Sequence, residues 1–141
     1  MPLTNDDDIR DLLAATRTIA VVGASDRTDR DSNRVMRFLV DQGYDVVPVN
    51  PTLSCAIHGR TVCGGLSEID RPVDLVDIFR RPDAVDPIVE EAIAIGAKAI
   101  WMQLGVINHA AAARAEAAGL KVVMDRCPKQ EIPRLGLERV L

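Results

Sequence analysis

The sequence has few aromatic residues, few cysteines and no excess of positive charge. One Trp, one Tyr and two Phe are too few to build stacking platforms for single-stranded nucleic acid. A net charge of −4 argues against a general nucleic-acid binder, which would carry a basic face. No apolar run approaches the length of a transmembrane helix. These absences exclude nucleic-acid and membrane partners from the expected functions.

The three cysteines, Cys55, Cys63 and Cys127, are an odd number without the spacing of a disulfide framework. Such thiols are typical of a reducing compartment. The first residues are acidic where a secretory leader would be basic. We therefore expect a cytoplasmic protein.

What the chain does have is an ordinary globular composition, with 48% hydrophobic and 27% charged residues over 141 positions. This length suits one domain, and we place it on residues 1–141. Residues 18–34 stand out. Four apolar residues are followed by Gly23-Ala24-Ser25, where a buried strand gives way to a small-residue turn. A turn of this kind before a helix favours binding of an anion such as phosphate.

The rest of the chain alternates between apolar runs and helical patterns. Further strands are predicted at residues 44–50, 73–79, 98–102 and 120–124. Helices are predicted from Thr4 to about Thr16, from Ser32 as N-cap to Gly43, from Pro82 to Gly96 and from Asn108 as N-cap to Gly119. Residues 52–67 lack a sustained period, apart from a short helical turn near 66–69, and no element is predicted in the tail after residue 124. The order predicts a Rossmann-like α/β fold, with a mainly parallel sheet of about five strands and helices on both faces.

In such sheets the ligand lies across the carboxyl ends of the strands. This rule gathers the Gly23 turn, Asn50-Pro51, residues 79–82 and residues 103–105 along one edge. A dinucleotide site would show more glycines after the first strand and an acidic residue at the end of the second. The second strand ends instead at Asn50-Pro51. The residues alone therefore predict a phosphate-binding edge and leave the ligand open.

An arginine-rich segment lies between the Gly23 turn and the following helix. Guanidinium groups beside a helix N-terminus suit a ligand with several phosphates. Three aspartates nearly balance this charge, so a solvated loop is the alternative. The arginines are Arg27, Arg30, Arg34 and Arg37.

Six blocks in order resemble the small stand-alone CoA-binding proteins, a family similar to the N-terminal CoA-binding domain of the succinyl-CoA synthetase α subunit. The blocks are Gly23-Ala24-Ser25, Ser32-Asn33-Arg34-Val35, residues 43–51 (GYDVVPVNP), residues 73–80 (VDLVDIFR), residues 101–106 (WMQLGV) and residues 123–128 (VMDRCP). The resemblance covers roughly residues 15–135. It implies a Rossmann-like domain that binds coenzyme A.

The resemblance also implies positions for the ligand. The backbone N–H groups of Gly23, Ala24 and Ser25 would take the pyrophosphate, with the Ser25 hydroxyl as a further donor. Arg30 and Ser32 would assist with phosphate, and Val35 would line the groove. The adenosine half would be bordered by Asn50, Pro51, Phe79, Arg80, Arg81 and Pro82, with Arg80 or Arg81 available to a phosphate. Gln103 and Gly105 would lie beside the pantetheine arm.

The sequence suggests no catalytic residue. A CoA ligase needs further domains and a phosphate-carrying histidine, whereas His58 lies in the irregular segment and His109 at a helix start. We therefore expect a CoA or acyl-CoA binding protein with a carrier, sensor or accessory role. Two alternatives stay open: a small NAD(P)-dependent oxidoreductase, and an accessory subunit of an acyl-CoA ligase. A homodimer, or a complex with an unidentified protein partner, is compatible with each of these functions.

Two constellations have competing interpretations. Cys55, His58 and Cys63 supply three zinc-type ligands but no fourth, so we expect no metal. Cys127, beside Arg126 and Lys129, is expected to pack at the end of the last strand; the alternative is a thiol that forms a mixed disulfide with CoA. Trp101 is expected either in the core or against the ligand.

Overall fold

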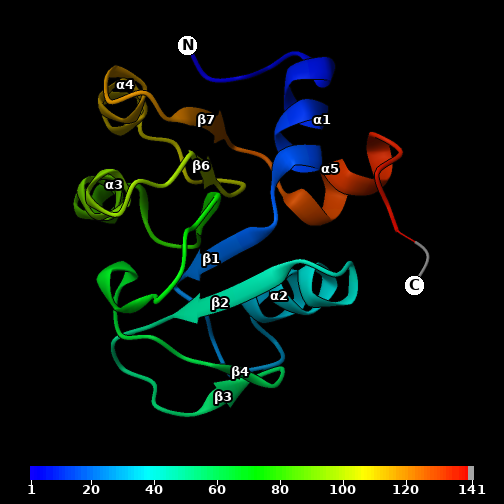
Figure 1. Ribbon diagram of the computed structural model, residues 1–141, viewed down its shortest axis with the longest axis vertical. Helices are drawn as coiled ribbons and strands as arrows, with labels where there is room; N and C mark the ends of the chain where they lie inside the picture. The colour runs from blue at the N-terminus through cyan, green and yellow to red at the C-terminus, as the bar shows by residue number, and fades with distance from the viewer. Residues whose placement is uncertain (140–141) are drawn as a thin grey trace.

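The computed structural model describes residues 1–139. The last two residues of the expected domain, 140 and 141, lie outside the described part. A central sheet of five parallel strands runs through the molecule (Figure 1). The strands are β1 (Thr18–Val22), β2 (Asp45–Val49), β5 (Leu75–Ile78), β6 (Ala99–Met102) and β7 (Lys121–Met124). The expected α/β fold is confirmed.

The order of strands in the sheet is β2-β1-β5-β6-β7. The chain thus grows outward from β1 in one direction to β2, and then in the other direction through β5, β6 and β7. The change of direction falls between β1 and β5. In doubly wound sheets, the carboxyl ends of the strands on either side of this switch point form the ligand-binding crevice.

Every residue of β1, β5 and β6 is buried. Successive side chains of a strand point to opposite faces, so a strand without a polar face requires cover on both sides. Figure 1 shows α3 (Val85–Ala94) and α4 (His109–Ala117) on one side of the sheet. The other side carries α1 (Asp6–Ala15), α2 (Asp31–Asp41) and α5 (Pro128–Arg134).

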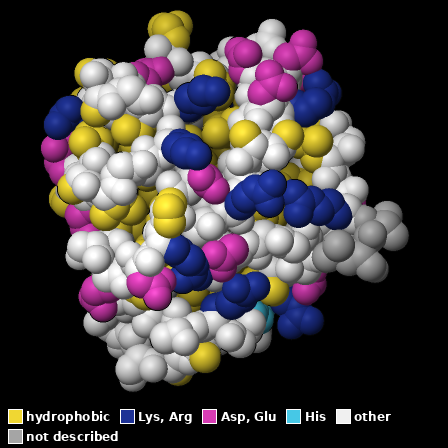
Figure 2. All heavy atoms as spheres, in the orientation of Figure 1, with side chains coloured by type: hydrophobic (Ala, Val, Ile, Leu, Met, Phe, Trp, Pro, Cys, Tyr) yellow, Lys and Arg dark blue, Asp and Glu magenta, His cyan; other side chains and the backbone are white. Residues whose placement is uncertain are grey.

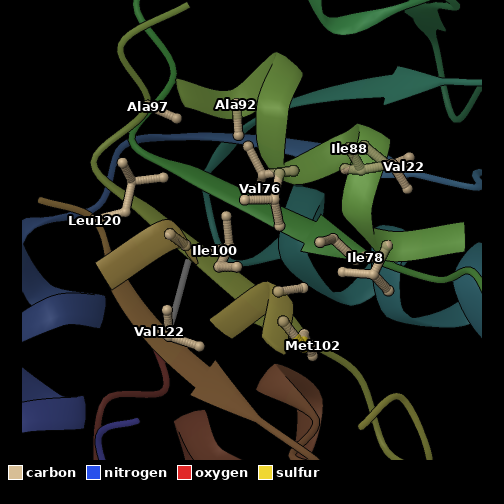
Figure 3. Packing of buried hydrophobic residues seen from close by; sticks show 14 of the residues in the cluster. Val22, Val76, Ile78, Ile88, Ala92, Ala97, Ile100, Met102, Leu120 and Val122 are labelled. Atoms are coloured by element: carbon tan, nitrogen blue, oxygen red, sulfur yellow. The ribbon is translucent and has the colours of Figure 1, made fainter. Parts of the chain in front are cut away.

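The core has two apolar clusters, one against each face of the sheet. On the α3 and α4 side, Val76, Ile78, Ile100 and Met102 meet helix residues that include Ile88 (Figure 3). On the other side, Val21 and Trp101 pack with residues of α1, α2 and α5. Full burial of such side chains contributes about 1.5–3 kcal/mol each, which is why the buried strands fix the fold.

Two of the predicted helix caps are wrong. Asn5, rather than Thr4, caps α1, because its side chain accepts a hydrogen bond from the Asp7 amide at 2.8 Å. The second helix begins at Asp31 with Arg30 as N-cap residue, so Ser32 lies inside the first turn and is buried. The prediction for Asn108 is confirmed, since its side chain accepts from the Ala111 amide at 3.0 Å.

A hairpin and a C-terminal helix were not predicted. The hairpin, β3 (Ala56–Ile57) and β4 (Arg60–Thr61), lies in the irregular segment. The helical turn expected near residues 66–69 follows it as the short 3-10 helix η1 (Leu66–Glu68). The hairpin turn places both His58 and Gly59 at positive φ, which stabilises a tight reversal despite strands of only two residues. The tail forms α5, whose Pro133 obscures the helical pattern. A second 3-10 turn, η2 (Pro82–Ala84), precedes α3.

Candidate functional site

The Gly23 turn lies at the switch point, over the end of β5. Gly23 has φ +86°, and a Cβ placed on it would lie 2.3 Å from the carbonyl oxygen of Phe79. The conformation and the close approach of the two backbones both require glycine here. Gly23 therefore lets β1 and β5 end side by side, which opens the crevice at the carboxyl edge.

The donors of this turn differ from those expected. The N–H groups of Gly23 and Ala24 both donate to the Val49 carbonyl oxygen, at 3.0 and 3.3 Å, because the pairing of β1 with β2 continues past the end of the strand. They are therefore engaged by the protein itself. The N–H groups of Ser25, Asp31 and Ser32 make no hydrogen bond within residues 1–139. These three groups, and not the first two of the turn, are free for an anion.

Two asparagines hold the turn in place. Asn33 donates to the Ser25 carbonyl oxygen at 2.8 Å, and Asn50 donates to the Ala24 carbonyl oxygen at 2.8 Å. The Asn50 side-chain oxygen accepts from the amide and hydroxyl of Thr52, at 2.9 and 2.7 Å. Through these hydrogen bonds, Asn50 acts on the site by fixing the backbone of the turn.

Three hollows lie along the carboxyl edge of the sheet. They are the Gly23 hollow, the Gln103 hollow and the Pro51 hollow, each called after one of its lining residues. The Gly23 hollow, with a volume of about 500 Å³, lies over the turn and the start of α2. It is lined by seven of the residues named from the sequence: Gly23, Ala24, Ser25, Arg30, Ser32, Asn50 and Phe79. Arg27, Asp29 and Asp31 complete its lining.

The Gln103 hollow has a volume of about 510 Å³ and lies between α2 and the start of α5. It shares Asp31 and Phe79 with the Gly23 hollow, so the two adjoin. Val35, Phe79 and Gln103 were named from the sequence; Arg34 belongs to the arginine-rich segment, and Leu104 lies within the residues 103–105 expected on this edge. The sequence reasoning did not assign Val106, Lys129 and Gln130 to the ligand site. Lys129 and Gln130 are brought here by α5, which the sequence pattern had not revealed.

The Pro51 hollow, with a volume of about 280 Å³, opens on the other side of the turn and shares Gly23 with the Gly23 hollow. Pro51 and Arg80, both named from the sequence, line it together with a mainly apolar wall. The other lining residues are Val22, Val49, Gly64, Gly65, Leu66, Ala84, Pro87, Ile88 and Glu91. The structure thus divides the named residues among three adjoining spaces.

Three named residues line none of these hollows. Arg81 is exposed and forms an ion pair with Asp83 at 3.5 Å. The Pro82 carbonyl oxygen accepts a hydrogen bond from the Asn108 side chain at 2.9 Å. The Gly105 amide donates to Asp125 at 2.8 Å. In this structure, Pro82 and Gly105 hold neighbouring loops together, whereas Arg81 remains at the surface.

Each hollow carries one cation without an acidic partner. Arg27 pairs with Asp29 at 3.3 Å, and the Arg34 guanidinium pairs with Asp31. In contrast, the exposed side chains of Arg30, Arg80 and Lys129 form neither an ion pair nor a hydrogen bond within the described chain. They line the Gly23, Pro51 and Gln103 hollows in that order. In an acidic protein this arrangement leaves positive charge available along one edge.

Two polar side chains near the Gln103 hollow are buried without hydrogen-bond partners. They are Asp77, through both carboxylate oxygens, and Gln103, through Oε1. Asp77 has no solvent exposure, and this burial raises the pKa of its carboxyl group well above the ordinary value. Burial thus favours the protonated form of the Asp77 carboxyl group.

The remaining candidates from the sequence are Trp101, Cys127 and the possible metal ligands. Trp101 is fully buried, and its ring N–H donates to the Arg126 carbonyl oxygen at 2.7 Å. Cys127 is packed in the apolar cluster, as expected, and also borders the Gln103 hollow. Among residues 1–139, no group of three or more His, Cys, Asp or Glu side chains could hold a metal ion.

On the face shown in Figure 2, basic side chains lie among acidic ones. No helix within the described chain combines the length and apolar character needed to cross a bilayer. A doubly wound α/β sheet with a glycine turn at its switch point places the protein in the class of Rossmann-like α/β domains.

The particular family follows from comparison with known proteins. Residues 17–133 match the family described as "CoA binding domain", and the chain belongs to this family. A Bacillus subtilis relative, "Uncharacterized protein YneT", is 39% identical over 122 residues, which are 86% of this chain and 90% of the relative. The expected resemblance to CoA-binding proteins is confirmed, and the family supports a CoA-binding role.

Solved structures agree in fold. A hypothetical protein from Pyrococcus horikoshii has a TM-score of 0.91 at 39% identity, with 96% of each chain covered. The dinucleotide-forming acetyl-coenzyme A synthetase 1 of Ca. Korarchaeum cryptofilum has a TM-score of 0.68 at 23% identity. That match covers 77% of this chain and 26% of the larger one, and at this identity it shows the fold alone.

Proposed function

We propose that the protein binds coenzyme A or acyl-CoA across the carboxyl edge of its sheet, in a carrier, sensor or accessory role. The observation that carries this proposal is the row of three adjoining hollows, each with one unpaired cation. A nucleotide with several phosphates and a long arm needs an extended site of this kind. The membership of the chain in the CoA-binding family supports the choice of ligand.

The pyrophosphate lies in the Gly23 hollow. There it meets the free N–H groups of Ser25, Asp31 and Ser32, the Ser25 hydroxyl and the guanidinium of Arg30. These groups include the N-terminal end of the eleven-residue helix α2, whose dipole favours negative charge. An anion at this point also compensates the positive charge of Arg30.

The two ends of the ligand leave the turn in opposite directions. The adenosine half lies in the Pro51 hollow, where Arg80 is available to a ribose phosphate. The pantetheine arm lies in the Gln103 hollow, along Val35, Phe79 and Val106, with Lys129 at its rim.

The test is isothermal titration of the purified protein with CoA, acetyl-CoA, ADP, NAD and NADP in one buffer. Protein denatured beforehand is checked for a released nucleotide, so that an occupied site is recognised. We expect binding of CoA at micromolar concentration or tighter, weaker binding of ADP, and no binding of NAD or NADP. Binding of NAD(P) with no response to CoA would instead favour the oxidoreductase alternative and overturn the proposal.

A further inference from the structure

Asp77 and Gln103 are buried polar side chains that complement each other. Within residues 1–139, the side-chain atoms that are buried without a hydrogen-bond partner are the two carboxylate oxygens of Asp77 and Oε1 of Gln103. Leaving such a group unsatisfied costs about 1–3 kcal/mol, and native proteins contain few of them. One of these residues lies in β5 and the other directly follows the neighbouring strand β6, so a single explanation for both unsatisfied groups is needed.

The sheet register places the two residues on the same face. Asp77 of β5 is directly opposite Trp101 of β6, and Gln103 follows Trp101 by two residues. The Gln103 amide still donates to the Ile78 carbonyl oxygen, at 3.4 Å, so the strand direction continues to this point. Strand spacing and rise separate the two Cα atoms by ~8 Å, a distance that an aspartate and a glutamine side chain span together.

Burial decides which partner is the donor. The side chains beside Asp77 in the sheet are Val21 and Trp101, both fully buried in the apolar cluster on this face. This environment raises the pKa of the Asp77 carboxyl group and so favours its protonated form, whose O–H can donate. The Oε1 atom of Gln103 can only accept.

The charged groups on the surrounding helices are engaged elsewhere or lie at the rim. Glu131 of α5 is paired with Arg126 and Arg134, and Asp31 of α2 is paired with Arg34. The titratable members of the apolar cluster itself are Tyr44 and Cys127. Helix α1 contributes the apolar side chains Ile9, Leu12 and Leu13 to this face. Burial is the cause of the raised pKa of Asp77, and no charged group contributes to it.

We propose that Asp77, as a neutral acid, donates a hydrogen bond to Oε1 of Gln103 and thereby directs the Gln103 amide nitrogen into the Gln103 hollow, as a donor to a carbonyl oxygen of the pantetheine arm. The identity of this ligand rests on the function proposed above. The oxygen and nitrogen ends of a glutamine amide have nearly the same shape, so hydrogen bonds decide which end faces a ligand. Asp77 is a positioning residue, and Gln103 contacts the ligand.

The binding test compares two substitutions at position 77. Asp77→Asn keeps a side-chain N–H donor for Gln103, whereas Asp77→Val removes it and matches the valine beside it in β1. We expect Asp77→Val to weaken CoA binding about fivefold, the effect of one hydrogen bond of about 1 kcal/mol. Asp77→Asn should stay within twofold of the unmodified protein. ADP, which lacks the arm, should bind equally to all three proteins.

The proposal is overturned if the Asp77→Val protein keeps the preference of the unmodified protein for CoA over ADP. This includes equal losses of affinity for CoA and ADP, which would indicate a general disturbance of the fold. Thermal unfolding of both variants identifies such a disturbance directly.

A second measurement needs no ligand and so separates this proposal from the proposed function. Infrared difference spectra of the ligand-free protein against Asp77→Asn should show the C=O band of a protonated carboxyl group at neutral pH. The band should shift in Gln103→Leu, which removes the acceptor. A missing band, or one unaffected by Gln103→Leu, would overturn the pairing. The band shift together with no CoA binding would reject the proposed ligand and keep the pairing.

Discussion

The two edges of the sheet offer hollows of similar size but of opposite character. At the amino edge, a hollow of about 490 Å³ is lined by Asp74 and Lys98, among others. Asp74 accepts hydrogen bonds from the amides of Arg17 and Thr18, at 2.9 and 3.0 Å, and Lys98 lies 3.4 Å from it. The polar groups that join the elements at this edge satisfy one another.

At the carboxyl edge, the corresponding groups are left open. Within residues 1–139, Arg30, Arg80 and Lys129 have no acidic partner, the N–H groups of Ser25, Asp31 and Ser32 make no hydrogen bond, and Oε1 of Gln103 is unsatisfied. Volume therefore does not distinguish a binding site from a surface hollow in this protein. Unsatisfied hydrogen-bonding groups do, because a ligand gains free energy only where it supplies partners that the protein lacks. An unpaired cation alone does not, since the exposed Lys121 of the amino-edge hollow also has no ion pair within residues 1–139.

The largest expected difference between the edges concerns two glycines. Gly23→Ala should lower the free energy of unfolding by ~2–5 kcal/mol, because positive φ is unfavourable for alanine and the new Cβ would collide with the Phe79 carbonyl oxygen. Gly119→Ala at the amino edge is the matched control. Gly119 has φ +93° but no atom within 4 Å of the added Cβ, so only the conformational cost of about 1 kcal/mol remains. Urea unfolding of both variants measures the difference, and equal losses would contradict it.

The second difference concerns cations and is measured as affinity. Arg30→Ala should weaken CoA binding at least tenfold, since a hydrogen bond to a charged group contributes about 1.5–3 kcal/mol. The dependence of binding on salt should fall at the same time. Lys98→Ala removes an exposed cation from the amino edge and should leave the affinity unchanged. Titration of both variants at two salt concentrations is the measurement; an Arg30→Ala protein that binds like the unmodified one would refute the placement of the phosphates.

The third and smallest difference concerns two aspartates three residues apart. Burial alone would raise the pKa of Asp74, but the amides of Thr18 and Arg17 and the ammonium group of Lys98 lower it below the ordinary value of 3.8. A carboxyl group whose pKa is lowered on folding stabilises the protein above its unfolded value, and this contribution is lost as the pH falls through the folded value. The pKa of Asp77 is shifted in the opposite direction, so its effect on stability has the opposite dependence on pH. Its raised pKa means that stability declines as the pH rises above the unfolded value of about 3.9.

Asp74→Asn should therefore destabilise the protein at pH 7 by about 1–2 kcal/mol and much less at pH 3. Asp77→Asn should improve relative to the unmodified protein as the pH rises from 3 to 7. Urea unfolding at the two pH values checks both signs. The same pH dependence in both variants would show that the two carboxyl groups do not differ in protonation.

Much of the fold could be predicted because buried parallel strands are continuous apolar runs. All five strands and the Gly23 turn were located from such runs and from the small residues that follow them. The hairpin at Ala56–Thr61 was missed, since strands of two residues have no detectable alternation. Helix α5 was missed because Pro133 breaks its pattern. The position of a helix start is also a local competition, which is why Asn5 and Arg30 replaced the predicted caps.

The candidate site was predictable in outline but not in its contacts. The topology rule placed residues from four strand ends on one edge, and the structure brings most of them around three adjoining hollows. Sequence reasoning could not show that the N–H groups of Gly23 and Ala24 are already used by Val49. It also could not place Lys129, which reaches the edge only through the undetected helix α5.

The sequence by itself determined the α/β fold and the family, and it predicted the edge on which a ligand would lie. These follow from hydrophobic periodicity and from small residues at a turn, which act over a few positions along the chain. Only the tertiary structure decided which arginines remain unpaired, which backbone donors stay free and that Asp77 and Gln103 are buried on the same face of the sheet. Those properties depend on neighbours distant in the sequence, because hydrogen bonding, charge pairing and burial are set by what the folded chain brings together.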